Sequence, residues 1–143
     1  MIKVRLASEN DFGYCRETEF PEVKDHLLKQ SIQNGWVYLV EIDKSIIGYA
    51  RLEFIWLTVP YLALITIEKD QQRKGAGTAL TNQIFKDLKE QGHQKIYTSS
   101  EVMEPEPQEF HRRCGFIECG LIAGMNDKGI GEVFFVKILK GTI

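Results

Sequence analysis

The sequence of 143 residues has few cysteines, no metal-ligand spacing and no long apolar run. Its three cysteines, Cys15, Cys114 and Cys119, form no C-x-x-C pair, and its three histidines are scattered along the chain. Neither a disulfide framework nor a structural zinc site is therefore predicted. No run of about 18 apolar residues is present to span a bilayer, and residues 2–6 alternate like a strand rather than opening a secretory signal. We expect a cytoplasmic protein with reduced thiols and no metal.

Neither positive nor negative charge is in large excess in the sequence. The chain has 18 Lys and Arg residues against 20 Asp and Glu residues, for a formal net charge of −2. This balance argues against general binding to nucleic acid or to an anionic membrane surface. The hydrophobic share of 43% is too large for a disordered chain, and the length predicts one domain over residues 1–143. A bound anion would have to be held locally, by backbone N–H groups and a few side chains.

Hydrophobic periodicity predicts an α/β domain with a mixed sheet. The predicted strands cover residues 2–6, 36–42, 46–57, 61–67, 95–98, 116–124 and 130–139. The predicted helices cover residues 8–18, 21–33, 76–91 and 107–113. Residues 43–45 are predicted to form the turn of a hairpin, and Pro60 is expected to interrupt the extended pattern before the apolar strand at 61–67.

A loop with two glycines, residues 72–78, lies between that apolar strand and the third predicted helix. Gly75 and Gly77 allow the backbone to turn tightly and to approach a ligand without side-chain clashes. The first turn of a helix has N–H groups without intrahelical partners, and its dipole favours negative charge. Arg73 and Lys74 add local positive charge. The loop is therefore predicted to bind a pyrophosphate group, although glycines at a strand–helix corner can also serve backbone geometry alone.

Two common phosphate-binding motifs do not fit this loop. A dinucleotide-binding fingerprint needs a third glycine where Leu80 stands, and a Walker loop needs Gly-Lys-Ser/Thr after four spacer residues, which this sequence lacks. The pattern that remains is Gln-x-x-Gly-x-Gly, which is loose when taken alone. Further along, the chain continues with Phe110-His111-Arg112-Arg113-Cys114-Gly115-Phe116.

Together these two segments resemble the signatures of the GNAT (Gcn5-related N-acetyltransferase) superfamily. Its acetyl-CoA-binding motif is Arg/Gln-x-x-Gly-x-Gly/Ala after the fourth strand, and its second signature is Phe-Tyr-x-x-x-Gly-Phe before the sixth. The resemblance implies a GNAT fold over essentially the whole chain, with a mixed, mostly antiparallel central sheet of about seven strands flanked by about four helices. It also implies acetyl-CoA as the acyl donor, and transfer of the acetyl group to a primary amine by direct attack.

The resemblance assigns the cofactor contacts by register. Backbone groups at Ile65 and Ile67 would pair with the pantetheine arm, and the N–H groups from Arg73 to Thr78 would hold the pyrophosphate. Gln72 would shape the loop. The predicted cofactor-binding residues are therefore Ile65, Thr66, Ile67, Gln72, Arg73, Lys74, Gly75, Ala76, Gly77 and Thr78.

The same resemblance implies the catalytic residues. Glu101, just beyond the strand at 95–98, lies where the family separates two strands at the acyl carbon, and it is the predicted general base; Glu53 or a chain of waters is the alternative. His111 takes the place of the family's usual tyrosine acid. As an imidazolium it could protonate the leaving thiolate, whereas a neutral ring could only contact the sulfur or have no chemical role. Cys114, one turn from His111, is interpreted as a packing residue rather than a nucleophile.

Acidic residues near the expected acceptor wall favour a cationic acceptor, such as a polyamine, an aminoglycoside or a lysine. These residues are Glu17, Glu19 and Glu22 around the first helix pair, and Glu101, Glu104 and Glu106 before the last helix. Glu104 also stands where many relatives have an asparagine that contacts the cofactor.

A function from a different class is also open. The chain could be a non-catalytic acyl-CoA-binding sensor or scaffold, because histidine replaces tyrosine in the second signature and the apolar strand has no carboxylate. A homodimer whose final strands pair or exchange is a further expectation, which the apolar run at 133–136 permits. Neither a nucleic acid nor a membrane partner is expected.

Overall fold

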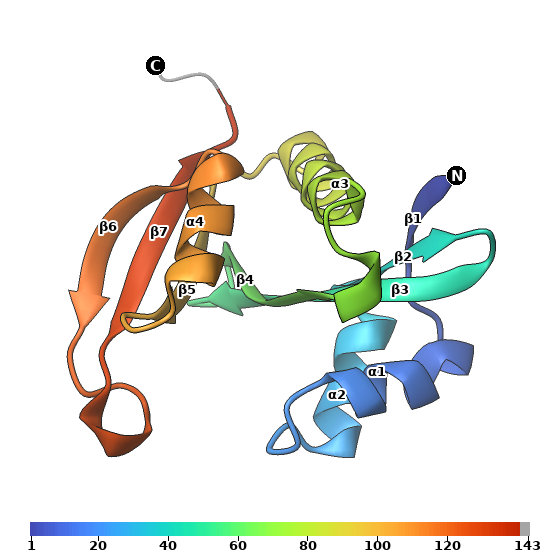
Figure 1. The fold of residues 1–143 in the computed structure, drawn as a ribbon, viewed down its shortest axis with the longest axis horizontal. Helices are drawn as coiled ribbons and strands as arrows, with labels where there is room; N and C mark the ends of the chain where they lie inside the picture. The colour runs from blue at the N-terminus through green and yellow to red at the C-terminus, as the bar shows by residue number, and fades with distance from the viewer. Residues whose placement is uncertain (141–143) are drawn as a thin grey trace. The chain divides into compact units, whose positions relative to one another are not determined.

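The computed structural model describes residues 1–140, and in that range the chain forms seven strands and four α-helices (Figure 1). The strands are β1 (Ile2–Leu6), β2 (Val37–Ile42), β3 (Ser45–Ile55), β4 (Val59–Ile67), β5 (Lys95–Glu101), β6 (Ile117–Ile122) and β7 (Glu132–Ile138). The helices are α1 (Phe12–Thr18), α2 (Asp25–Gln33), α3 (Ala76–Glu90) and α4 (Pro105–Arg113). Short 3₁₀ turns lie at Glu9–Asp11, Lys69–Gln71 and Asp127–Gly129.

The strands form one sheet in the order β1-β2-β3-β4-β5-β7-β6. β4 and β5 pair in parallel, with Tyr61 opposite Tyr97, whereas β1 with β2, β2 with β3, β5 with β7 and β6 with β7 pair in antiparallel. The predicted mixed and mostly antiparallel sheet with four helices is therefore confirmed. None of the helices in residues 1–140 is long and apolar enough to cross a membrane.

Three element boundaries predicted from prolines were wrong. The second helix begins at Asp25, because Pro21 lies in a turn ahead of it. Pro60 does not interrupt the extended chain but is the second residue of β4, where a missing N–H is tolerated near the start of a strand. Pro105 is the first residue of α4, which therefore begins two residues earlier than predicted; the first helical position needs no N–H bond.

β5 is longer than predicted and includes Glu101 as its last residue. Its ladder with β7 runs from Lys95 opposite Ile138 to Glu101 opposite Glu132. The predicted strand ended at residue 98, because the prediction followed apolar residues only and the next two residues, Ser99 and Ser100, are polar. Glu101 is thus held by the sheet and does not lie in the loop beyond it.

The chain divides into two compact units. Unit 1 comprises Met1–Glu53 and Ala63–Ile84, and unit 2 comprises Phe54–Leu62 and Phe85–Ile143. The buried residues of one core cluster in unit 1 come from α1, α2, β2 and β3 and their flanks. They are Ala7, Cys15, Leu28, Ile32, Val37, Leu39 and Tyr49.

A buried ion pair joins the end of α1 to β3 in unit 1. Glu19 is 4% exposed and Arg51 is 6% exposed. The Arg51 guanidinium donates to both carboxylate oxygens of Glu19, and the Tyr49 hydroxyl donates to Glu19 Oε1 at 2.7 Å. The prediction that Glu19 belongs to an acidic surface for a cationic acceptor was therefore wrong, because its charge is already neutralised inside the unit.

The β5–β7 pair in unit 2 has two unlike faces. Ile96, Thr98 and Ser100 of β5, with Val133 and Phe135 of β7, are buried, and α4 packs against β5. The alternate residues form the other face, which is half-buried and includes two carboxylates and two hydroxyls. Those residues are Tyr97, Ser99, Glu101, Glu132 and Phe134.

Candidate active site

The loop of residues 72–78 turns the chain of unit 1 from β4 into α3. Arg73 and Gly75 both adopt left-handed φ values, +67° and +87°. Gln72 Nε2 donates to the carbonyl oxygen of Ile67 at 3.1 Å, which ties the start of the loop to the end of β4. Gly77 is already helical, because α3 begins at Ala76. Only the first of the two glycines therefore makes the turn.

The loop delivers the N-terminus of α3, a helix of 15 residues. The N–H of Ala79 donates to the carbonyl oxygen of Gly75 at 2.9 Å. Helix geometry leaves the N–H groups before that bond without intrahelical acceptors, so those of Ala76, Gly77 and Thr78 can donate to an anion. Lys74 is exposed and donates to Gln71 Oε1 at 3.1 Å. These residues fit a pyrophosphate group, with backbone donors and nearby positive charge.

The expected pantetheine-binding residues lie at the end of β4, also in unit 1. Ile65, Thr66 and Ile67 are half-buried. A Cβ placed on Gly48 of β3 would come within 2.5 Å of Ile67 Cδ1 and 3.1 Å of the Thr66 carbonyl oxygen. The absence of a side chain at Gly48 therefore allows β3 to lie close to this part of β4. The close contact with β3 holds the backbone of Ile65–Ile67, which would meet the cofactor, in place.

We predict that Gly75→Val raises the dissociation constant of acetyl-CoA at least about tenfold. A β-branched residue at φ +87° is strained by about 1–2 kcal/mol, so the loop would relax away from its left-handed turn. Isothermal titration calorimetry measures this effect. Gly129→Val is the matched control, because Gly129 has a similar φ of +77° and open space around it but lies in the turn before β7. Equal affinity in the two variants would contradict the role of the loop.

His111 lies on α4 in unit 2 and is buried, with 4% of its surface exposed. Its ring packs beside those of Phe116 and Phe135, at centroid distances of 5.9 and 5.4 Å. Burial lowers the pKa of His111 to about 4, and a hydrogen bond with the Ser99 backbone and the charge of Glu132 only partly oppose that shift. The ring is thus neutral at pH 7, which favours the neutral-ring alternative over an imidazolium acid. Its Nδ1 has no hydrogen-bond partner within residues 1–140.

Glu101 is half-buried, and its backbone is fixed by neighbouring groups of unit 2. Its carbonyl oxygen accepts from Gln108 Nε2 at 3.0 Å and from the N–H of Glu104 at 3.0 Å. Its side chain lies on the half-buried face of β5. The alternative base, Glu53, belongs to unit 1 and is engaged by Arg51 Nη1 at 2.6 Å. Glu101 and His111 both belong to unit 2, whereas the cofactor-binding residues belong to unit 1. His111 packs against Phe135 on the buried face of the β5–β7 pair, and Glu101 lies on the other face.

Sequence reasoning missed a hydrogen-bonded chain in unit 2. Tyr61 Oη lies 2.6 Å from Ser99 Oγ, Ser99 Oγ donates to Glu132 Oε2 at 2.6 Å, and Asn126 Nδ2 donates to Glu132 Oε1 at 2.7 Å. The period-two spacing of Tyr97, Ser99 and Glu101 was the available signal, since it places polar groups on one face of a strand. The partners of Ser99, which are Tyr61 on β4 and Glu132 on β7, come from distant parts of the sequence.

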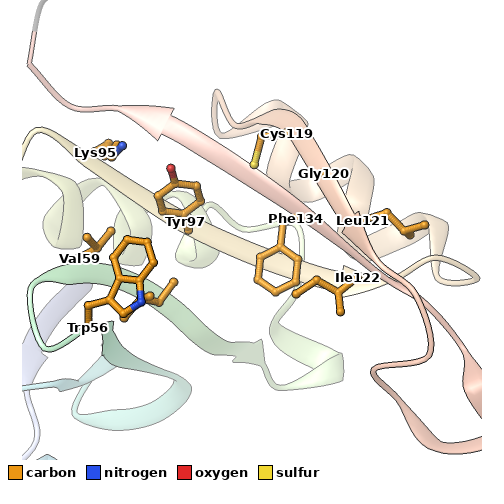
Figure 2. Close-up of a pocket in the computed structure, with 10 residues that line it drawn as sticks. Trp56, Val59, Lys95, Tyr97, Cys119, Gly120, Leu121, Ile122 and Phe134 are labelled. Carbon is orange, nitrogen blue, oxygen red and sulfur yellow. The ribbon is translucent and has the colours of Figure 1, made fainter.

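An apolar groove of about 360 Å³ lies in unit 2 (Figure 2). Figure 2 shows the rings of Trp56, Tyr97 and Phe134 among its lining side chains, with Leu121 and Ile122 of β6 beyond them. Tyr97 and Phe134 belong to the same half-buried face as Ser99 and Glu132. The groove therefore continues the surface that the hydrogen-bonded chain occupies.

Comparison with known families decides the classification. The model described as "Acetyltransferase (GNAT) family" matches residues 3–116. The chain belongs to this family. Acetyl-CoA is the acyl donor that the family uses. No curated protein matches the sequence significantly.

Solved structures share the fold of this GNAT chain at low sequence identity. Ard1 from Thermoplasma volcanium matches with a TM-score of 0.84 and 14% identity, over 98% of this chain and 99% of that one. The ribosomal-protein-S18-alanine N-acetyltransferase from Escherichia coli matches with a TM-score of 0.82 and 15% identity, over 100% and 97%. A chain of the NatC complex bound to Gag peptide and CoA matches with a TM-score of 0.81 and 12% identity, over 97% and 99%.

No group of three or more His, Cys, Asp or Glu side chains is placed to hold a metal ion within residues 1–140. None of the three cysteines, which all lie within residues 1–140, forms a disulfide. Burial raises the pKa of the Cys15 thiol to about 12, so this cysteine is chemically inert at neutral pH.

Proposed function

We propose that this GNAT chain transfers the acetyl group of acetyl-CoA to a primary amine of a small molecule or a peptide. The observation that carries the proposal is the left-handed turn at Arg73 and Gly75, which opens α3 with a row of backbone N–H donors. When bound, acetyl-CoA supplies an acyl carbon activated as a thioester. The N–H groups of Ala76, Gly77 and Thr78 would bind its pyrophosphate, with Arg73 and Lys74 adding positive charge.

The backbone of Ile65–Ile67 would orient the pantetheine arm through hydrogen bonds of the strand-pairing kind. Glu101, fixed at the end of β5, would take a proton from the ammonium form of the acceptor before the attack, directly or through water. His111, buried and neutral at pH 7 because its pKa is about 4, would not protonate the leaving group. The thiolate would then take its proton from water, because a thiol with an ordinary pKa near 8.5 is readily protonated near neutral pH.

The acceptor remains a primary amine in this proposal, and two classes are the first to examine. The E. coli protein with the same fold is named as an alanine N-acetyltransferase of ribosomal protein S18, which makes a peptide N-terminus one class. Cationic small amines are the other, because Glu101, Glu104 and Glu106 are exposed or half-exposed. We propose the cytoplasm as the compartment, since Cys119 is a free thiol on the surface.

Thiol release from acetyl-CoA tests the proposal. The panel contains spermidine, lysine, kanamycin and a peptide with a free N-terminal alanine, and each reaction is checked for the acetylated product by mass spectrometry. We expect amine-dependent release of CoA with one acetylated product for each turnover. Binding of acetyl-CoA without turnover on any amine would contradict the proposal.

A further inference from the structure

We propose that Glu132, acting through Ser99 and Tyr61, is the end of a proton relay that takes the proton of the acceptor amine during attack. The inference rests on the proposed acetyl transfer and adds three residues to it. It differs from the role assigned to Glu101, because the proton moves along hydroxyl groups of two strands, β4 and β5, to a carboxylate of β7.

The relay is continuous and lies entirely in unit 2. Tyr61 of β4, Ser99 of β5 and Glu132 of β7 are joined by two contacts of 2.6 Å. Distances of 2.5–2.7 Å are typical of a hydroxyl that donates to a carboxylate. Asn126 donates to the second carboxylate oxygen at 2.7 Å and fixes its orientation. All four residues are half-buried, so these hydrogen bonds are partly shielded from water but still reach the protein surface.

The direction of the hydrogen bonds follows from counting protons. A serine hydroxyl has one proton, and Ser99 donates it to Glu132. The contact between Tyr61 and Ser99 must then have Tyr61 as its donor, since Ser99 has no second proton to give. A phenolic oxygen that donates can still accept. The chain therefore points one way, from an accepting oxygen on Tyr61 to the carboxylate of Glu132.

The neighbours of Glu132 include a second carboxylate. Glu101 is directly opposite Glu132 across the β5–β7 ladder and lies on the same face of the sheet. From α4, His111 is neutral at pH 7, so it does not offset the charge of Glu132. On the same face, Tyr61 stacks on Phe134 with a centroid distance of 6.0 Å, which positions the phenol.

The proposed step balances in atoms and electrons. The lone pair of the neutral amine forms the new C–N bond, and the electron pair of the broken C–S bond stays with the CoA sulfur. As the C–N bond forms, the nitrogen becomes acidic and its proton passes to Tyr61 Oη. The Tyr61 proton passes to Ser99 Oγ in the same event, and the Ser99 proton passes to Glu132 Oε2. The products are the amide, a protonated Glu132 and a thiolate, and water carries the proton from Glu132 afterwards.

The test compares Ser99→Ala with Ser100→Ala. Both variants remove one hydroxyl from adjacent residues of β5, but Ser100 points to the buried face and its Oγ has no hydrogen-bond partner within residues 1–140. The assay uses acetyl-CoA and the amine of the panel that the wild type acetylates fastest. We expect kcat/KM to fall about 100-fold in Ser99→Ala, at the low end of what general acid–base catalysis contributes, and to stay close to the wild-type value in Ser100→Ala. Ser99→Thr keeps a hydroxyl and should restore most of the rate.

A second readout separates proton transfer from packing. The wild type should show a solvent isotope effect with a curved dependence on the deuterium fraction, because several protons move together. Ser99→Ala and Glu132→Gln should lose the curvature, while melting temperatures check that both variants fold. Rates of Ser99→Ala within twofold of wild type, or equal losses in Ser99→Ala and Ser100→Ala, would overturn the relay. A wild type that acetylates no amine would instead overturn the proposed function.

Discussion

A Glu19→Ala variant is expected to lose about 3 kcal/mol of its free energy of unfolding, near the lower end of the range for breaking a buried ion pair. The substitution leaves Arg51 with a buried charge and removes the acceptor of the Tyr49 hydroxyl. Arg51 keeps one partner, because its Nη1 also donates to the half-exposed Glu53. That remaining contact is the reason to expect a loss at the lower end rather than about 5 kcal/mol. Urea denaturation followed by circular dichroism measures the change.

The control for Glu19 is Glu17→Ala, two residues earlier on α1. Glu17 is exposed, so its removal should change the free energy of unfolding by less than about 0.5 kcal/mol. Both variants remove one carboxylate and alter the net charge equally. Only the loss of the buried carboxylate, that of Glu19, should lower the free energy of unfolding substantially. A Glu19→Ala variant as stable as Glu17→Ala would show that the ion pair contributes nothing.

The second large effect is a dependence of stability on pH that comes from His111. Burial lowers the pKa of His111 from 6.5 to about 4 in the folded state, so the unfolded chain binds the extra proton first as the pH falls. The stabilisation is therefore fully present above about pH 6.5 and is lost progressively between about pH 6.5 and pH 4. A difference of this size corresponds to about 3 kcal/mol.

The variant His111→Phe isolates this contribution from that of the carboxylates. It keeps an aromatic ring beside Phe116 and Phe135 and removes the titrating group. We expect the free energy of unfolding of the variant to vary less between pH 4 and pH 6.5 than that of the wild type, by about 3 kcal/mol. Parallel slopes for the two proteins over this range would contradict the burial of a neutral imidazole.

The sequence predicted the elements whose signal is local. Alternation in β1 and the apolar face of α3 placed both elements within a residue or two of their observed bounds. The β2–β3 hairpin was also predicted, and its turn consists of Asp43 and Lys44, both with left-handed φ, as expected for a tight two-residue connection. The glycine loop was predicted for the same reason, because a tight left-handed turn favours glycine at the turning residue itself.

Features that depend on distant partners could not be predicted in this way. Glu19 looked like a surface carboxylate until β3 brought Arg51 and Tyr49 to it, 32 and 30 residues away. The contact between Tyr61 and Ser99 spans 38 residues, and that between Ser99 and Glu132 spans 33. A single sequence carries no record of which strands become neighbours, so polar residues of this kind are interpreted as solvated until the sheet order is known.

The most direct test of the account is the acetylation assay with matched loop variants. Wild-type protein, Gly75→Val and Gly129→Val are incubated with acetyl-CoA and each amine of the panel, and the acetylated product is counted by mass spectrometry. We expect the wild type and Gly129→Val to acetylate an amine at similar rates. Gly75→Val should be much slower at a low concentration of acetyl-CoA and should recover at a saturating concentration. Acetyl-CoA bound by the wild type with no acetylated amine, or equal rates in the two glycine variants, would contradict this expectation.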